Sequence, residues 1–260
     1  MKLSSLRTLV LGLAGWWVLG MTVIHAAPAE TATPPPASAT VELKWSELPP
    51  IPDSRGLAGM YAGLSGDALL AAGGANFPDA LPWEGGTKTW TDRVWVLEAP
   101  DGSWKEAGTL PSPRGYGVGI TVPGHGVVCV GGNDSARHFA DAFVLSWTPA
   151  GGLVRRDLPP LPEPAANLCG AAMGTTVWIA GGEREPGATA ASDGFWSLDV
   201  AAPNPEWKRR PTWPGPARTL AVAGTQSGKF ILAGGVALRA GADGKQERVQ
   251  PYLSDGYAFD

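Results

Sequence analysis

The apolar positions of this chain form short runs rather than helical stripes. Four of these runs end in a pair of glycines, and they lie at residues 68–74, 127–132, 177–182 and 230–235. Short runs bounded by glycine are typical of buried strands followed by tight turns. Glycine suits such turns because it tolerates positive φ and a close backbone approach. The pattern predicts four equivalent strands, closed by Gly74, Gly132, Gly182 and Gly235.

Three further strands accompany each run in the same order. After each glycine pair come a loop and a strand that begins at an acidic residue, then a strand that carries tryptophan in most copies. A proline-rich corner and a strand of small residues follow. The acidic residues are Asp92, Asp141, Asp193 and Asp255. Four strands in a period of roughly 50 residues are typical of a Kelch repeat, which forms one blade of a β-propeller. The sequence therefore predicts an all-β, Kelch-type β-propeller over residues 41–260, with about four blades and no helix after residue 40.

The repeat does not begin and end on whole blades. A strand predicted at 41–45 has the position of a fourth strand, and the strand at 257–260 has that of a third. One interpretation is a C-terminally truncated piece of a larger propeller, which would leave unpaired strand edges. The other is a closed four-bladed ring in which 41–45 completes the last blade. We favour the first.

The N-terminal segment has the pattern of an export signal. Lys2 and Arg7 precede an apolar run at 9–24, and small residues follow it. We therefore expect a signal peptide over 1–26, a linker rich in proline, alanine and threonine over 27–40, and a secreted or periplasmic protein. The alternative is an uncleaved membrane anchor, but the run is near the lower length limit for a spanning helix.

Composition narrows the possible partners. The net charge is −4, and loss of the two basic residues of the signal makes the remaining chain more acidic. This balance argues against nucleic acid, which requires a basic surface, and no segment after the signal is apolar enough to cross a membrane. Cys129 and Cys169 lie in apolar runs and should be small buried residues, with a disulfide left open. Nothing in the sequence specifies an oligomeric state.

Four segments carry a resemblance to a known family. They are AGGANFP (72–78), GTKTWTDRVWVL (86–97), SPRGYGVG (112–119) and VWIAGGEREPG (177–187). On these segments the chain resembles the N-acetylneuraminate epimerases, or sialic-acid mutarotases, and specifically a circularly permuted branch of them. The resemblance implies a six-bladed propeller and an isomerase that needs no cofactor and interconverts the anomers of sialic acid or a related acidic sugar. The alternative is a non-catalytic propeller that binds a glycan or a protein partner, because propellers host many functions.

The topology of an up-and-down blade predicts where a site would lie. Loops between the second and third strands, and corners between blades, emerge on one face around the central channel. The corners should bring Arg55, Arg114 and Arg218 to that face, at equivalent places in three blades. They could bind the carboxylate of an acidic sugar. The structural alternative is that they bond neighbouring carbonyl groups and aspartates.

Glu183 is the candidate catalytic residue, because it directly follows the third glycine pair at the channel. Mutarotation needs a group that takes the proton of the anomeric hydroxyl, and a carboxylate can do this. The resemblance implies a partner arginine six residues further on, but this sequence has Thr189 there, which weakens the case for catalysis more than that for binding. The alternative is a solvated loop acid.

Two further residues could contact a sugar. Lys88 lies in one of the four segments that carry the resemblance, and Asn76 follows the first glycine pair. Each has a plain alternative, because Lys88 could be a solvated loop lysine and Asn76 a turn cap. The two histidines after the signal, His125 and His138, lack the spacing of metal ligands, so we expect no metal.

Overall fold

The computed structural model describes residues 43–260. The chain divides into two units, residues 1–45 and 46–260. The expected signal peptide and linker lie outside the described residues. The strand expected at 41–45 is not found in its described part, because residues 43–45 form no strand. Within 43–260 no helix has the length and apolarity needed to cross a membrane.

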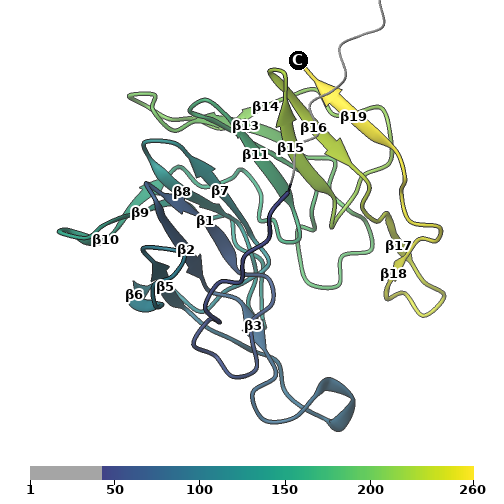
Figure 1. Cartoon of the computed structure of the whole chain (residues 1–260). Helices are drawn as coiled ribbons and strands as arrows, with labels where there is room; N and C mark the ends of the chain where they lie inside the picture. Colours follow the sequence, from purple (N-terminus) through teal and green to yellow (C-terminus); the bar gives the residue numbers. More distant parts are fainter. Residues whose placement is uncertain (1–42) are drawn as a thin grey trace, which may run out of the picture. The chain divides into compact units, whose positions relative to one another are not determined.

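Residues 46–260 form four antiparallel sheets that follow one another along the chain (Figure 1). The strands of blade I are β1 (Tyr61–Ser65), β2 (Ala68–Ala72), β5 (Arg93–Leu97) and β6 (Lys105–Thr109). Those of blade II are β7 (Val118–Val122), β8 (Gly126–Val130), β9 (Ala142–Thr148) and β10 (Gly152–Leu158). Those of blade III are β11 (Cys169–Met173), β12 (Thr176–Ala180), β13 (Phe195–Asp199) and β14 (Lys208–Arg209). Those of blade IV are β15 (Val222–Gln226), β16 (Lys229–Ala233) and β19 (Gly256–Phe259). The predicted all-β propeller with about four blades is confirmed.

The loops between the second and third strands of blades I and IV carry small hairpins. In blade I this hairpin is β3 (Ala75–Asn76) with β4 (Thr89–Trp90), and in blade IV it is β17 (Leu238–Ala240) with β18 (Gln246–Arg248). Both loops extend toward the lower side of Figure 1, as expected for loops that share one face. The single helical element among residues 43–260 is a 3₁₀ turn, η1 (Pro82–Glu84), in the blade I loop.

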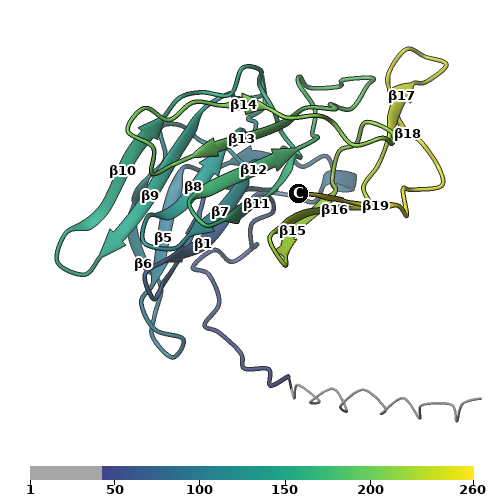
Figure 2. The same cartoon turned by 90° about the horizontal axis from the view of Figure 1, so that it is seen from above.

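The first strands of successive blades pack side by side, β1 on β7, β7 on β11 and β11 on β15. Figure 2 shows the resulting fan of sheets from above. Apolar clusters fill the space between neighbouring blades. Cys129 and Cys169 are buried in these clusters as free thiols, and burial raises the pKa of both, that of Cys169 to about 12. Within residues 46–260, β1 and β15 show no comparable packing, so the blades form an open arc rather than the closed ring of the alternative.

The glycine pairs of blades I, II and III connect each of these blades to the corner that leads into the next one. In all four pairs the first glycine has φ between 62° and 68° and the second between 98° and 101°, directly after the second strand of the blade. The amide of Gly74 donates to the carbonyl oxygen of Arg114 (2.8 Å), and Gly132 donates likewise to Ala165 (2.7 Å). Side chains would prevent this approach, because a Cβ on Gly131 would overlap the carbonyl of Ala165. The predicted equivalence of the four pairs is confirmed.

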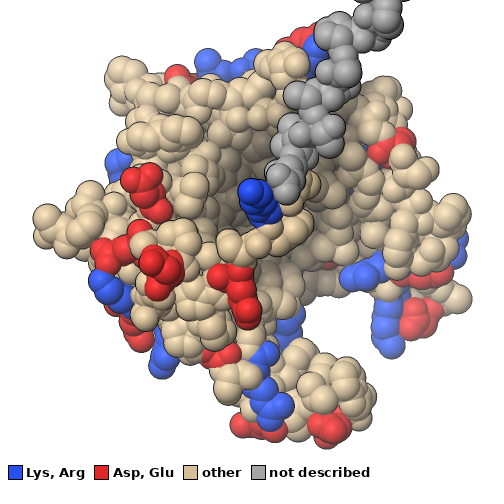
Figure 3. Space-filling view, viewed as in Figure 1, with Lys and Arg blue, Asp and Glu red and all other residues tan. Residues whose placement is uncertain are grey.

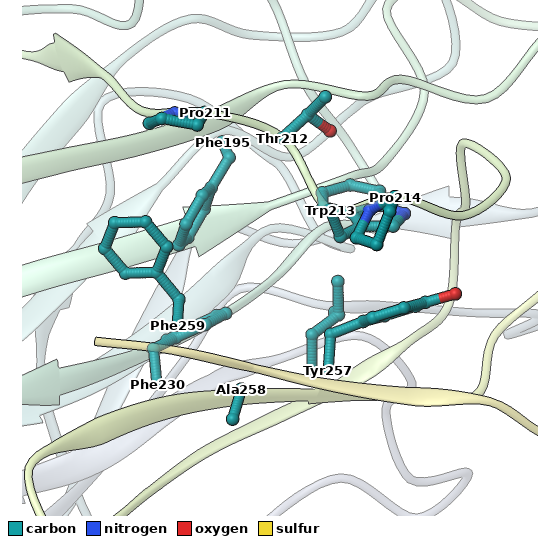
Figure 4. Close-up of a pocket in the computed structure, with 10 residues that line it drawn as sticks. Phe195, Pro211, Thr212, Trp213, Pro214, Phe230, Tyr257, Ala258 and Phe259 are labelled. Atoms are coloured by element: carbon teal, nitrogen blue, oxygen red, sulfur yellow. The ribbon is translucent and has the colours of Figure 1, made fainter.

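Blade IV leaves one edge of its sheet uncovered. β19 pairs with β16, and no fourth strand covers it within residues 46–260. Beside it lies an apolar cavity of about 270 Å³. Figure 4 shows aromatic side chains of blades III and IV and of the corner between them around this cavity. They are Phe195, Trp213, Phe230, Tyr257 and Phe259. The cavity is apolar, and the polar site described next lies elsewhere in the fold.

Candidate active site

A chain of backbone hydrogen bonds links the four corners of the propeller. Residues at equivalent places in the four corners have positive φ, and these residues are Gly59, Tyr116, Asn167 and Leu220. The amide of each donates to the carbonyl of its predecessor in this series, at 2.7, 2.7 and 2.9 Å. Residues with a Cβ are strained in this conformation, and such strain is concentrated at functional sites. The chain of bonds brings Tyr116 and Asn167 next to each other on the face that carries the long loops.

Glu183 is held beside this chain of bonds. Its backbone bridges that of Ala166, the residue before Asn167. Its Oε1 accepts hydrogen bonds from Asn167 Nδ2 (3.1 Å) and Thr219 Oγ1 (3.0 Å). Its Oε2 accepts one from Gln246 Nε2 (3.0 Å). Glu183 is 8% exposed, which does not fit the alternative of a solvated loop acid.

The hydrogen-bond donors around Glu183 are neutral. Two are amides and one is a hydroxyl, so they can bond an ionised carboxylate without neutralising it. Among the described residues, no lysine or arginine forms an ion pair with Glu183. Arg184, the next residue, instead pairs with Glu163 at 2.7 Å and Asp193 at 3.5 Å. Thr189 is exposed and makes no side-chain hydrogen bond in the described part of the chain.

The side chains of Arg114 and Arg218 bond other residues of the protein at the corners. Arg218 is fully buried and donates to Asp255 at 2.8 and 3.0 Å and to the carbonyl of Gly234 at 2.9 Å. Arg114 is 2% exposed and pairs with Asp141 at 2.7 Å, with its guanidinium 4.0 Å from the ring centroid of Phe139. These contacts fit the structural alternative, in which the arginines bond neighbouring carbonyl groups and aspartates. The hydrogen bond from Arg218, followed by that from Tyr257, lowers the pKa of Asp255 to about 2.

The expected equivalence of Arg55 with the other two arginines is wrong. The backbone bridges pair Ala58, Gly115, Ala166 and Thr219 with the residues that follow the four glycine pairs. Each bridged residue is preceded by the true equivalent, so the equivalent of Arg114 and Arg218 is Leu57 in blade I and Ala165 in blade III. Arg55 lies two residues earlier and is exposed beside a groove of about 450 Å³ that Asn76 and Tyr116 also line.

Lys88 and Asn76 differ in the contacts that their side chains make. Lys88 is half-buried, with Nζ 3.9 Å from the ring centroid of Tyr116 and 5.0 Å from that of Trp90. This geometry is a cation–π contact rather than a solvated lysine. The Asn76 amide donates to Asp53 Oδ1 (3.1 Å) and to the carbonyl of Gly56 (3.0 Å), as a turn cap does. Asn76 therefore shapes the groove. Lys88 places a positive charge beside Tyr116, one of the corner residues that the backbone hydrogen bonds link.

Sequence reasoning missed several polar neighbours of Glu183. Thr219 and Gln246 bond its carboxylate, and His138 Nδ1 lies 3.0 Å from its backbone oxygen. Thr219 could have been found from the repeat, because the other three blades have alanine or glycine at its position. Gln246 carries no such signal, because the long loop that contains it does not repeat the sequence of the loops in the other blades. Within residues 43–260 no group of His, Cys, Asp and Glu side chains is arranged to hold a metal ion.

Charged residues on the face seen in Figure 3 are scattered and of both signs, and most of the surface is uncharged. The candidate site consists of Glu183 and its hydrogen-bond donors, and Lys88 is connected to them through Tyr116 and Asn167. The protein belongs to the class of β-propellers, because its four antiparallel sheets are arranged around their first strands and its polar loops gather on one face.

Comparison with known proteins gives the resemblance independent support. A family model described as N-acetylneuraminate epimerase matches residues 36–151. The N-acetylneuraminate epimerase of Brucella suis is 40% identical over 117 residues, which cover 40% of this chain and 29% of the relative. That of Yersinia pestis (strain Pestoides F) is 39% identical over 102 residues, 35% of this chain and 25% of the relative. The resemblance inferred from the sequence is confirmed for this segment.

The sequence matches cover part of this chain and part of each relative. The chain spans less than a third of the length of the curated relatives it matches. The matched segment includes Arg55, Asn76, Lys88 and Arg114, whereas Glu183 lies beyond it. A solved structure titled "Structure of YjhT" aligns over 86% of this chain and 73% of its own, with a TM-score of 0.67 and 17% identity. This likeness supports the propeller fold.

Proposed function

We propose that this chain is a mutarotase-like isomerase that interconverts the anomers of sialic acid or a related acidic sugar. The observation that carries the proposal is the position of Glu183, a nearly buried carboxylate with neutral donors on the face where the corner residues meet. The family match over residues 36–151 supports the class of substrate.

In this reaction Glu183 accepts the proton of the anomeric hydroxyl. The bond between the anomeric carbon and the ring oxygen then breaks, the ring oxygen takes up the proton that Glu183 has accepted, and the open-chain keto sugar forms. Rotation about the adjacent bond and the reverse sequence give the other anomer, so protons and electrons balance. Asn167 and Thr219 hold Glu183 Oε1 in place. A fixed carboxylate in a partly dehydrated site is a more effective base than a mobile one, because it needs little reorganisation.

The test is the rate of anomer interconversion of N-acetylneuraminate, followed by proton NMR. We expect the wild-type protein to accelerate it and Glu183→Gln to lose most of the acceleration while remaining folded. Glu185→Gln is the matched control, because it removes an exposed carboxylate two residues further along the same loop. Equal rates for the wild-type and Glu183→Gln proteins would refute the assigned role of Glu183.

The second candidate is a propeller that binds an acidic glycan without catalysis. Thr189 favours it, because the resemblance implies an arginine at that position. Wild-type protein that binds the sugar and leaves the spontaneous anomerisation rate unchanged would establish this candidate instead.

We also propose that the protein is exported, on the pattern of residues 1–26. Mass spectrometry of the protein recovered from a secreting host tests this. A mature N-terminus near residue 27 supports export, and an intact N-terminus in the cytoplasmic fraction contradicts it.

A further inference from the structure

A polar side chain connects the hairpin β17–β18 to the propeller. Its two strands pair with each other and form a separate two-stranded sheet in the described part of the chain. Figures 1 and 2 show it projecting from blade IV. The side chain of Gln246 in β18 connects it to blade III, because Nε2 donates to Glu183 Oε2 (3.0 Å) and to the carbonyl of Ala188 (2.8 Å). One face of the hairpin is thereby turned toward Glu183.

The side chains of a β-strand point alternately to its two faces, and this determines which other residues share the face of Gln246. Residues i and i+2 of a strand point to the same side, and residue i+1 points to the other. Arg248 therefore lies on the face of Gln246, whereas Glu247 lies on the opposite face. The contacts agree, because Glu247 pairs across the hairpin with Arg239 at 2.7 Å.

Arg248 is exposed and has no ion pair within residues 43–260. Its Cα lies roughly 7 Å along the strand from that of Gln246, which itself bonds Glu183. An extended arginine side chain spans a comparable distance, so its guanidinium can reach the space beside Glu183. Arg114 and Arg218 cannot serve in this way, because they are buried and paired with Asp141 and Asp255.

We propose that Arg248 binds the carboxylate of the acidic sugar at the Glu183 site, and that the hairpin β17–β18 selects acidic over neutral sugars. The inference rests on the proposed function, because it concerns the substrate of the same site. A guanidinium can bind a carboxylate with two parallel hydrogen bonds, which fix the orientation of the sugar as well as its charge. The anomeric carbon of sialic acid carries the carboxylate, so binding it beside Glu183 also places the anomeric hydroxyl near the base.

The test measures binding of N-acetylneuraminate and of its uncharged methyl ester by isothermal titration calorimetry. We expect the wild-type protein to prefer the acid, and Arg248→Ala to weaken binding of the acid at least about tenfold with little change for the ester. Arg248→Lys should restore part of the preference, because it keeps the charge without the two-pronged geometry. Arg239→Ala is the matched control, because it removes the same charge from the opposite face of the same hairpin.

The results for the two variants distinguish the role of Arg248 from the proposed function. If the wild-type protein binds the acid and Arg248→Ala binds it equally well, the role of Arg248 is wrong and the proposed function stands. If Arg239→Ala weakens binding as much as Arg248→Ala, the effect is one of general charge and the inference is also wrong. If the wild-type protein binds neither compound, the proposed function and the inference fail together.

Discussion

The amide of Gln246 donates a 3.0 Å hydrogen bond to Oε2 of Glu183, although 63 residues separate them in the sequence. This bond joins the loop of blade IV to the carboxylate of blade III. It also occupies an oxygen that a substrate hydroxyl could use. The hairpin and the candidate base are therefore coupled, and loosening one should be measurable at the other.

Gln246→Ala should release the hairpin. The variant loses the bonds to Glu183 and to the carbonyl of Ala188, and among the described strands β17 and β18 pack closely only on each other. We expect faster hydrogen exchange of the Val249 amide, which bonds the carbonyl of Ala237 at the base of the hairpin. Mass spectrometry of peptides over 236–254 measures this. Glu247→Ala is the control on the opposite face, and equal exchange in the Gln246→Ala and wild-type proteins would contradict the coupling.

Arg218→Ala should destabilise the fold by about 2 kcal/mol, because it removes a fully buried side chain and leaves the partly exposed Asp255 carboxylate and the carbonyl of Gly234 without its hydrogen bonds. The variant breaks the bonds to Asp255 and to the carbonyl of Gly234. Urea denaturation measures the free energy of unfolding. Arg55→Ala is the matched control, since Arg55 is an exposed corner arginine and its removal should change stability by less than about 0.5 kcal/mol. Similar values for the two variants would argue against the structural role of Arg218.

Asp255 should contribute to stability at neutral pH and lose this contribution in acid. Its pKa in the folded protein is about 2, below the ordinary value of about 3.9 for an aspartate in an unfolded chain. A lowered pKa means that the folded state favours the ionised form, so the contribution is present above about pH 4 and disappears as the pH falls toward 2. Asp255→Asn should therefore lower stability at pH 7 and reduce the pH dependence between about pH 4 and 2. Urea denaturation at several pH values tests this, with the exposed Asp79→Asn as control.

The fold could be predicted from the sequence because its signals are local and recur. A glycine pair after an apolar run requires the same backbone in each blade, and four copies in order leave little freedom for another architecture. Glu183 could be located for the same reason, since it directly follows such a pair.

The corners and the long loop were less predictable. Corners differ in length, and proline and arginine in a turn do not determine which residue bridges to the glycine pair. For this reason the sequence pattern aligns Arg55 with Arg114, although Leu57 has that position in the structure. The burial of Arg114 and Arg218 depends on aspartates further along the chain, Asp141 and Asp255. These contacts between distant segments have no periodic signature.

Substitutions of the first glycine in each pair should report on whether a neighbouring blade is present. Gly131 and Gly234 have nearly the same φ, 66° and 62°. A Cβ on Gly131 would overlap the carbonyl of Ala165 in the next corner, whereas a Cβ on Gly234 would meet no atom closer than 3.5 Å, the carbonyl oxygen of Leu253. Both alanine variants carry the strain of a left-handed conformation, about 1 kcal/mol. Only Gly131→Ala adds a steric conflict with backbone.

We therefore expect Gly131→Ala to cost about 3 kcal/mol or more, and Gly234→Ala only about 1 kcal/mol. Urea denaturation of both variants measures the difference. Gly181→Ala provides a second comparison, because its Cβ would overlap the carbonyl of Arg218 and its cost should resemble that of Gly131→Ala. If Gly234→Ala proved as costly as the other two, another backbone would have to approach Gly234 in solution. The side of blade IV next to Gly234 would then be covered, by a further blade or by a second copy of the chain.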